Sequence, residues 1–249
     1  DFLFLNKYFG SMIKIVLSVF FIFVNCLQSQ MDPNPDRFFL SDDGDQVFIK
    51  DFLDWDKKNT FEKNGILFIG SSSIRKWKTA EYFNYKLSII NRGFGGSHIS
   101  DINYYFNAIV LKYRPKIIVF YAGDNDIAGK KAPEQVLDDY VEFVGLVRKN
   151  IKQARIIYIP IKPSPSRWSL WGDMAETNKL IKMFIDSDDQ QIYLDTATPM
   201  LNNRGKPSGH LFVSDSLHLS EEGYDLWSGI LKPALDSLIY LDRFKIFPW

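Results

Sequence analysis

The sequence predicts a single α/β domain, a three-layer α/β/α sandwich in which helices cover both faces of a five-stranded parallel sheet. Two observations lead to this fold class. Five short apolar runs are bounded by turn-forming residues, as buried strands are. The longer segments between them repeat their apolar residues at helical spacing. Strands that alternate with helices form a parallel sheet, because each helix carries the chain back across one face of the sheet.

The first strand is predicted at residues 66–70, which read I-L-F-I-G. It stands between Asn64-Gly65 and three serines, residues 71–73. A loosely amphipathic helix is predicted before it, with one face formed by Val47, Phe48, Phe52, Leu53, Trp55 and Phe61. Ligands bind at the carboxyl ends of strands in open parallel sheets, so the three serines lie where a functional group is expected.

The second and third strands run into loops of unusual composition. Residues 87–90 form the second strand and lead into N-R-G-F-G-G, and Ser97 or Ser100 is available as N-cap of the helix after this loop. Residues 116–121 form the third strand and lead directly into A-G-D-N-D. The next helix begins near Pro133, because proline fits the first turn of a helix.

The fourth and fifth strands are predicted at residues 155–159 and 191–194. A loop at residues 163–171 and a helix separate them. After the fifth strand a long loop leads to Asp215 and His218, and the last helix begins near Ser220.

Composition and charge exclude several classes of partner. The 249 residues include 30 basic and 30 acidic side chains, which gives a net charge of zero, and no block of like charges stands out. A nucleic-acid groove or a polybasic membrane patch needs an excess of positive charge, so we expect neither. No repeat or linker interrupts the chain. We therefore expect a polar lead-in at residues 30–45 and one domain at residues 46–249.

Residues 1–29 are predicted to be an upstream extension followed by a signal peptide. The apolar run from Ile15 to Val24 is shorter than the roughly 20 apolar residues of a membrane-spanning helix. Cleavage near Ser29 would give an exported protein, periplasmic or secreted, without the only cysteine, Cys26. Membrane contact is expected only if Cys26 carries a lipid or the signal stays uncleaved. Lipid attachment is the less favoured alternative, because Asn25 stands where a small residue is usual.

Four of the predicted loops each carry one chemically useful group. These groups are Ser72, Gly96, Asn125 and the pair Asp215 and His218. Acyl transfer to a serine needs a base for the hydroxyl proton, an acid that orients the base, and donors for the developing oxyanion. The carboxylate three residues before His218 can reach one ring nitrogen while the other faces a serine.

These blocks resemble the SGNH, or GDSL-type, family of serine esterases and lipases, including members related to platelet-activating-factor acetylhydrolase. The family's G-D-S-L block is matched by residues 70–73, its single-glycine loop by Gly96, its G-x-N-D block by residues 123–126 and its D-x-x-H block by residues 215–218. The four blocks occur in the family's order and extend over most of the predicted domain.

The resemblance implies a flavodoxin-like sheet, the SGNH hydrolase fold, with Ser72 as nucleophile, His218 as base and Asp215 as its orienting partner. It also implies an oxyanion hole formed by the backbone N–H groups of Ser72 and Gly96 and the side-chain amide of Asn125. No cofactor and no metal are implied. Ser71 departs from the family pattern, which has aspartate there, and this leaves open how the turn is braced.

Each of these residues also has an ordinary structural explanation. Serine is common at helix N-caps, glycine permits a positive φ, and asparagine often closes its own turn. His98 could line the site, although a solvated residue at a helix start is the simpler explanation. His210 has no partner in the sequence. A metal site is disfavoured because the chain has no H-E-x-x-H motif and no cysteine cluster.

We expect an exported serine esterase that hydrolyses short acyl esters, such as acetyl esters of a small molecule or carbohydrate, through an acyl-enzyme. Arg75, Trp168 and Trp171 are candidate substrate contacts; the tryptophans fit equally well as a cover over the sheet, and Arg75 as part of an ion pair. The alternatives are a lipid acylhydrolase or lysophospholipase-like enzyme, an acyltransferase, and a non-catalytic module that binds a carbohydrate or partner. A lipid substrate predicts a broad apolar rim around Ser72, and a short ester predicts a narrow pocket.

Overall fold

The structure, a computed structural model, describes residues 32–39 and 49–244, with the side chains of 241–244 left aside. From Asn34 onward the chain forms one compact unit, and residues 1–33 are grouped separately. The predicted signal peptide, its cleavage site and Cys26 lie outside the described residues. Across the described part of the chain, no helix is both long and apolar enough to cross a membrane.

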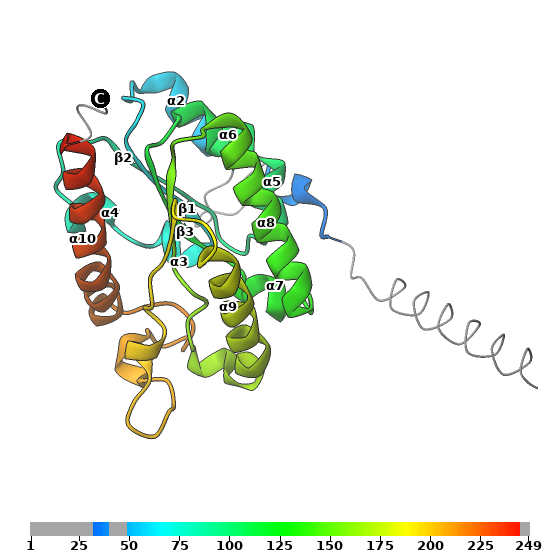
Figure 1. The fold of residues 1–249 in the computed structure, drawn as a ribbon. Coiled ribbons are helices and arrows are strands. Elements are labelled where there is room, and N and C mark those ends of the chain that lie inside the picture. The colour runs from blue at the N-terminus through cyan, green and yellow to red at the C-terminus, as the bar shows by residue number, and fades with distance from the viewer. Residues whose placement is uncertain (1–31, 40–48, 245–249) are drawn as a thin grey trace, which may run out of the picture. The chain divides into compact units, whose positions relative to one another are not determined.

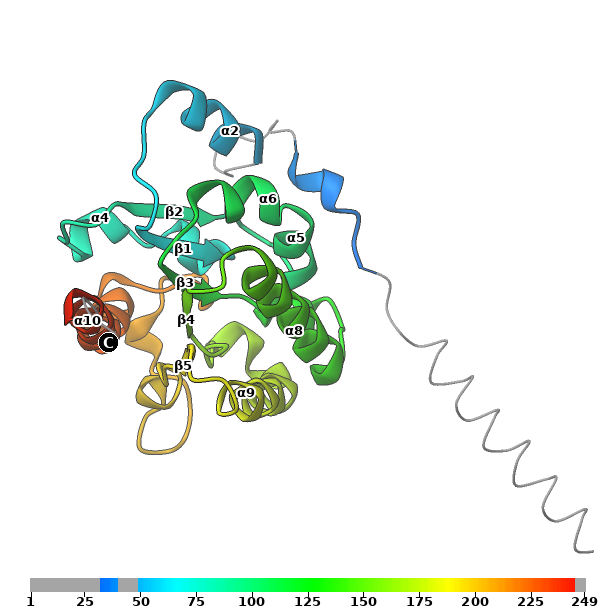
Figure 2. The same cartoon turned by 45° about the horizontal axis from the view of Figure 1, so that its top comes forward.

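The centre of the unit is a sheet of five parallel strands in the order β2-β1-β3-β4-β5 (Figures 1 and 2). The strands are β1 (Ile66–Gly70), β2 (Ile89–Gly93), β3 (Ile117–Tyr121), β4 (Arg155–Tyr158) and β5 (Gln191–Tyr193). All four neighbouring pairs are parallel. The predicted fold class is therefore confirmed, and the expected strands shift by no more than two or three residues at their ends.

Helices cover both faces of the sheet, because side chains alternate between the two faces along each strand. On one face, Leu67 and Ile69 of β1 pack with helices α2 (Ile49–Lys58), α5 (Ile99–Tyr104), α6 (Phe106–Ile109), α8 (Pro133–Asn150) and α9 (Trp171–Ile185). On the other face, Ile66 and Phe68 pack with α10 (Glu221–Phe244) and with Trp77 and Phe83. Figure 2 shows α10 on the opposite side of the sheet from α8 and α9.

The helix predicted after the second strand is broken into shorter pieces. It forms α5, α6 and a 3-10 turn at Leu111–Tyr113, because the backbone at Tyr105 leaves helical geometry. The prediction of a serine N-cap is wrong. His98 occupies that position, its N–H donates to the Asp101 carboxylate at 2.8 Å, and Ser97 Oγ donates to the Phe94 carbonyl at 3.0 Å instead. Asp101 thus accepts from the N–H of the N-cap residue, whereas a serine cap would accept from an N–H of the first helical turn.

The unit includes residues that the sequence assigned to the polar lead-in. A 3-10 helix at Pro35–Phe38 buries Phe38 against Phe94, with ring centroids 5.1 Å apart. Arg37 pairs with the buried carboxylate of Asp101 at 2.7 Å. The domain therefore extends to residues 34–39, because one aromatic side chain in this polar stretch reaches the core.

Strand register brings the loops after β1, β2 and β3 to the same edge of the sheet. Gly70 at the end of β1 pairs with Gly93 on β2 and with Tyr121 on β3. Glycine is required at position 70, because φ is +147° and a Cβ would lie 1.8 Å from the Tyr121 carbonyl oxygen. Three chemically useful loops therefore begin side by side.

Candidate active site

Ser72 begins the short helix α3 (Ser72–Arg75) directly after β1. Backbone bonds brace this turn: the Ser71 N–H donates to the Tyr121 carbonyl at 3.0 Å, and the Ser71 carbonyl accepts from Ile74 and Arg75, each at 3.0 Å. The Ser71 side chain is buried, and its hydroxyl has no hydrogen-bond partner among the described residues. Ser71 can therefore replace the aspartate of the family pattern because the main chain holds the turn.

Ser72, His218 and Asp215 form a continuous hydrogen-bonded relay. The Ser72 hydroxyl lies 3.0 Å from His218 Nε2, and His218 Nδ1 lies 2.5 Å from Asp215 Oδ2. Ser72 is half-buried, and the His218 side chain is 21% exposed, so substrate can reach both. An imidazole placed in this way can remove the serine proton while the carboxylate holds its other ring nitrogen.

The loop around Asp215 is fixed by its own backbone. Asp215 Oδ1 accepts from the N–H groups of Leu217 and His218 at 2.8 and 2.9 Å. Partial burial alone would raise the pKa of Asp215, but hydrogen bonds from the His218 side chain and these two N–H groups lower it to about 2. The Asp215 carboxyl is therefore ionised at every pH at which an esterase is assayed.

The three predicted oxyanion donors lie on the loops after β1, β2 and β3. Gly96 has φ of +78°, and nothing lies within 4 Å of the position a Cβ would occupy there, so the space beside it is open. The N–H groups of Gly96 and Ser72 make no hydrogen bond to another described residue. Asn125, on α7 (Asp124–Ala128), donates through Nδ2 to the Ser97 carbonyl at 3.1 Å, which links the second loop to the third.

Sequence reasoning missed a buried charge cluster beside Asn125. Asp124 accepts from Lys162 Nζ at 3.0 Å and pairs with Arg167 Nη1 at 3.2 Å, and Arg167 Nη2 donates to Asn125 Oδ1 at 3.0 Å. The Lys162 side chain is only 1% exposed. One signal was available, because K-P-S-P-S-R-W follows β4 and therefore lies at the same edge of the sheet.

A second buried cluster surrounds Asp126, the residue after Asn125. Its carboxylate accepts from the Ile99 N–H at 3.1 Å and lies 3.4 Å from Lys131 Nζ and 3.8 Å from His98 Nδ1. The His98 side chain is 12% exposed, so the expectation that it is solvated is wrong, because it packs against α7 at Gly129. Within residues 32–39 and 49–244, no three acidic, histidine or cysteine side chains are placed to hold a metal ion.

The Asp126 cluster predicts a pH-dependent stability. Burial raises the pKa of Asp126 to about 7, although Lys131 and the Ile99 N–H act in the opposite direction. The folded protein therefore keeps a proton that the unfolded chain loses above a pKa of 3.8. The contribution of Asp126 to stability is full below that value and falls as the pH rises through about 7.

Asp126→Asn should remove this fall, because asparagine keeps an oxygen for Ile99 and cannot ionise. We expect the difference in Tm between the variant and wild type to grow in favour of the variant from about pH 4.5 to 7.5. The difference should grow by about 2–4 °C for each kcal/mol of unfolding free energy that wild type loses over this range. Thermal unfolding at five pH values measures the difference. A Tm difference that stays constant with pH would show that Asp126 keeps one protonation state in the folded and unfolded chain.

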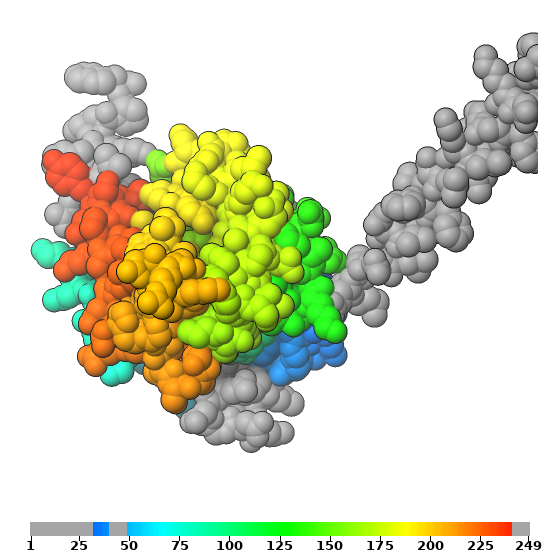
Figure 3. Space-filling view, turned by 90° about the horizontal axis from the view of Figure 1, so that it is seen from below, coloured from blue at the N-terminus to red at the C-terminus, as the bar shows by residue number. Residues whose placement is uncertain are grey.

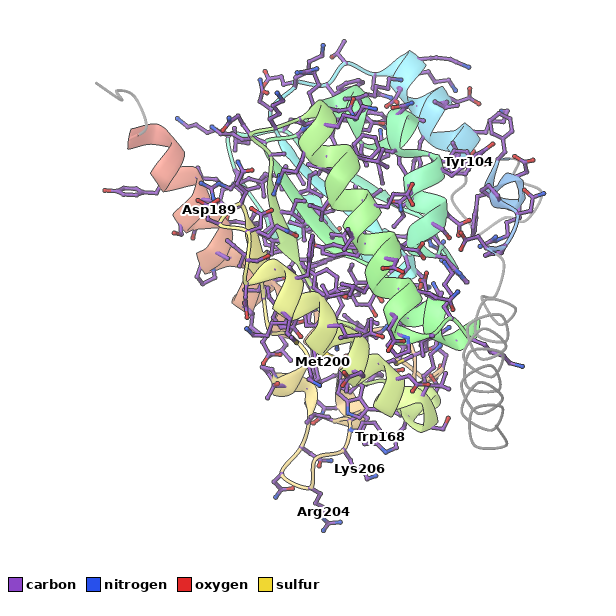
Figure 4. All side chains as sticks on the ribbon, turned by 45° about the vertical axis from the view of Figure 1, so that its right-hand side comes forward. Tyr104, Trp168, Asp189, Met200, Arg204 and Lys206 are labelled. Carbon is purple, nitrogen blue, oxygen red and sulfur yellow. The ribbon has the colours of Figure 1, made fainter. Side chains whose placement is uncertain are left out.

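The candidate substrate contacts lie around this edge of the sheet in different environments. The rings of Trp168 and Trp171 stack 5.8 Å apart, and Lys206 Nζ lies 4.7 Å from the Trp168 centroid. Figure 4 shows Trp168 and Lys206 at the same end of the molecule, with Arg204 at the tip of a projecting loop. Trp171 also packs against the core, and Arg75 lies against the backbone of Gly95. No contact tests whether these side chains bind substrate, so that role stays a prediction.

A cleft of about 490 Å³ opens beside His218. It lies between the segment after Ser72 and the start of α10, and its surface is about equally polar and apolar. Five of its ten lining residues are charged, namely Lys76, Lys78, Glu81, Glu221 and Asp225, and the others are His218, Tyr82, Tyr224, Val213 and Leu219. Figure 3 looks onto the end of the molecule where residues 200–220 lie beside the segment around residue 170. Of the five site residues, His218 alone lines this cleft.

The sequence profile of the GDSL-like lipase/acylhydrolase family matches residues 73–226, which is more than half of the chain. The chain belongs to this family. The membership confirms the predicted resemblance and places the protein among serine ester hydrolases. The match begins one residue after Ser72 and includes the other four site residues, Gly96, Asn125, Asp215 and His218.

Solved structures of similar fold carry several descriptions. A Streptococcus pneumonia protein provisionally described as a platelet activating factor is 21% identical, with a TM-score of 0.68 over 75% of this chain and 90% of that one. An acetyl xylan esterase, AlAXEase, is 18% identical, with a TM-score of 0.59 over 68% and 98%. A family 3 carbohydrate esterase from Clostridium thermocellum is 15% identical, with a TM-score of 0.55 over 72% and 99%. A comparison with curated proteins found no match.

Proposed function

We propose that the protein hydrolyses short acyl esters, above all acetyl esters, of polar alcohols such as carbohydrates. Ser72 attacks the ester carbonyl as His218 takes its proton, and Asp215 holds the imidazole and stabilises its charged form. The Ser72 and Gly96 N–H groups and the Asn125 amide stabilise the oxyanion. His218 then gives the proton to the leaving alcohol, and water releases the acid from Ser72 by the same steps.

The cleft beside His218 carries the substrate proposal. The leaving alcohol receives its proton from His218, so the alcohol must lie on the histidine side of Ser72. Five charged side chains and two tyrosines line the cleft beside His218. Burial and a hydrogen bond to Asp225 raise the pKa of Tyr82 to about 12, so its hydroxyl stays protonated there. A sugar matches such walls better than an acyl chain or a lipid tail does.

Two further observations support the proposal. Large exposed apolar side chains are scattered over the described surface, and of these only Val213 lines the cleft, whereas a lipid substrate predicts an apolar rim. The neighbours of similar fold include proteins described as an acetyl xylan esterase and a carbohydrate esterase. The signal-like segment at residues 12–30 supports export, which would bring the enzyme to extracellular polysaccharides.

A substrate series tests the proposal. We expect kcat/KM for 4-nitrophenyl esters to fall at least about tenfold from acetate to octanoate, since each added methylene gains binding free energy only where apolar surface covers it. Acetylated xylo-oligosaccharides should release acetate. A preference for octanoate or for a lysophospholipid would overturn the substrate class. Transfer of the acyl group to an added sugar in preference to water would indicate an acyltransferase.

A fluorophosphonate distinguishes the enzyme from a binding module. We expect one phosphonyl group per chain, located by mass spectrometry on the peptide that contains Ser72, with loss of esterase activity in proportion to labelling. A protein that binds acetylated oligosaccharide but neither reacts with the phosphonate nor hydrolyses any ester would be a binding module.

A further inference from the structure

The Asn125 side-chain amide is held by two partners of opposite hydrogen-bonding character. Its Oδ1 accepts from Arg167 Nη2 at 3.0 Å, and its Nδ2 donates to the Ser97 carbonyl at 3.1 Å. A guanidinium offers only donors, and a carbonyl offers only acceptors. The flipped amide would place two donors together and two acceptors together. Arg167 and Ser97 therefore permit one orientation of Asn125.

This orientation leaves one N–H of Asn125 for a substrate. Nδ2 carries two hydrogens, and Ser97 takes one of them. No other described residue accepts from Nδ2. The remaining hydrogen is the one that can reach an oxyanion on the substrate. If the amide turned over, an oxygen would replace this donor and would repel the oxyanion.

Arg167 is itself held in place by a buried carboxylate. Its Nη1 lies 3.2 Å from Asp124 Oδ2, which also accepts from Lys162, and the exposed fractions of the Arg167 and Asp124 side chains are 19% and 4%. Burial alone would raise the pKa of Asp124, but Lys162 and Arg167 outweigh it and lower the pKa. Asp124 is therefore a carboxylate shared by Lys162 and Arg167.

The segment that carries Arg167 also contacts the loop of the base. Arg167 lies at a kink within the 3-10 segment Pro165–Leu170, and the N–H of Ser166 donates to the Ser216 carbonyl at 3.0 Å. Ser216 stands between Asp215 and His218 and has a left-handed φ of +57°. Two consecutive residues, Ser166 and Arg167, thus bond to the base loop and to the Asn125 amide.

We propose that Arg167 is a positioning residue for the oxyanion hole. Arg167 keeps the Asn125 amide turned so that its remaining N–H faces the substrate oxygen. The 3-10 segment Pro165–Leu170 also contacts the Asp215–His218 loop, and so it fixes the position of the Asn125 N–H relative to the base. The inference rests on the proposed function, in which Asn125 is an oxyanion donor. The competing explanation is that Arg167 binds an acidic group of the substrate directly.

A double-mutant cycle on the neutral ester 4-nitrophenyl acetate separates the two explanations. Asn125→Ala should lower kcat by about 10²–10³-fold, as removal of one oxyanion donor does. Arg167→Met should lower kcat by at least about tenfold with little change in KM. In the Asn125→Ala background, Arg167→Met should change kcat less than about threefold, because its partner is already absent.

Each outcome of the cycle decides one question. The positioning role would be overturned if Arg167→Met lowered kcat in the Asn125→Ala background as much as it does alone. It would also be overturned if Arg167→Met alone left kcat unchanged. A rise in KM confined to acidic substrates would assign Arg167 to substrate binding. If Asn125→Ala alone loses nothing on an ester that wild type hydrolyses, the oxyanion role of Asn125 fails, which is a failure of the proposed function.

Further variants guard against unfolding. Arg167→Met leaves Asp124 paired with Lys162, so we expect Tm to stay within a few degrees of wild type. Arg167→Lys keeps the charge and should recover part of the lost kcat, although one ammonium cannot match the fork of a guanidinium that contacts both Asp124 and Asn125. If Arg167→Met does not fold, Arg167→Lys with and without Asn125→Ala gives the same cycle. Arg204→Met is the matched control, since Arg204 is exposed at a loop tip (Figure 4).

Discussion

Ser72→Ala is expected to lower kcat/KM for 4-nitrophenyl acetate by about 10⁴–10⁶-fold. The Ser72 hydroxyl is 3.0 Å from His218 Nε2, and it is the group that would carry the acyl chain. Its removal leaves the oxyanion donors in place but takes away the covalent step. Steady-state kinetics with purified protein measures the loss, and thermal unfolding checks that Tm is unchanged.

Ser73→Ala is the matched control for this variant. Ser73 is the next residue in the chain and is buried, and its hydroxyl has no hydrogen-bond partner among the described residues. We therefore expect Ser73→Ala to keep wild-type kcat/KM. If Ser72→Ala retained more than about a tenth of the activity, the nucleophile would be another group, and the proposed mechanism would fail.

The sequence predicted the fold because buried strands leave local patterns in the chain, and it predicted the members of the relay because short local blocks match those of the family. Buried strands such as β1 appear as short apolar runs, and Asp215 and His218 are three residues apart on one loop. The match of residues 70–73 to the family's G-D-S-L block then selected Ser72 among three adjacent serines. The structure accounts for that selection physically, since Ser71 and Ser73 are buried and only Ser72 reaches His218.

The support for the site could not be predicted, because it depends on contacts between distant residues. Arg167 meets Asn125 across 42 positions, and a lone arginine after a Pro-Ser run has no pattern that names its partner. The same limit explains the two errors near α5. His98 was expected to be solvated because the sequence does not reveal that α7 covers it, and His98 itself occupies the N-cap position predicted for a serine. The sequence also left Ser71 unexplained, because its main-chain hydrogen bonds to Tyr121 and to its own turn cannot be read from the sequence.

Asp215→Asn is expected to lower kcat by about 10⁴-fold without unfolding the protein. Asparagine keeps an oxygen for the N–H groups of Leu217 and His218, so the loop should hold its shape. Its NH₂ group then faces His218 Nδ1 in place of Oδ2. Nδ1 must then accept from this amide, so the neutral imidazole carries its proton on Nε2. An Nε2 that already carries a proton cannot take the proton of Ser72.

Asp195→Asn is the control for this change. The Asp195 carboxylate likewise accepts from two backbone N–H groups, those of Ala197 and Thr198, at 3.1 and 2.9 Å, but no hydrogen bond or ion pair joins it to a histidine among the described residues. The same substitution there should leave kcat unchanged. If Asp215→Asn lost less than about tenfold with its Tm preserved, Ser72 and His218 would suffice as a dyad, and the imidazole would be oriented by its packing rather than by the carboxylate. The contact between Nδ1 and Oδ2 argues for the larger loss, because a carboxylate can only accept here and so keeps the proton on Nδ1 and the ring turned toward Ser72.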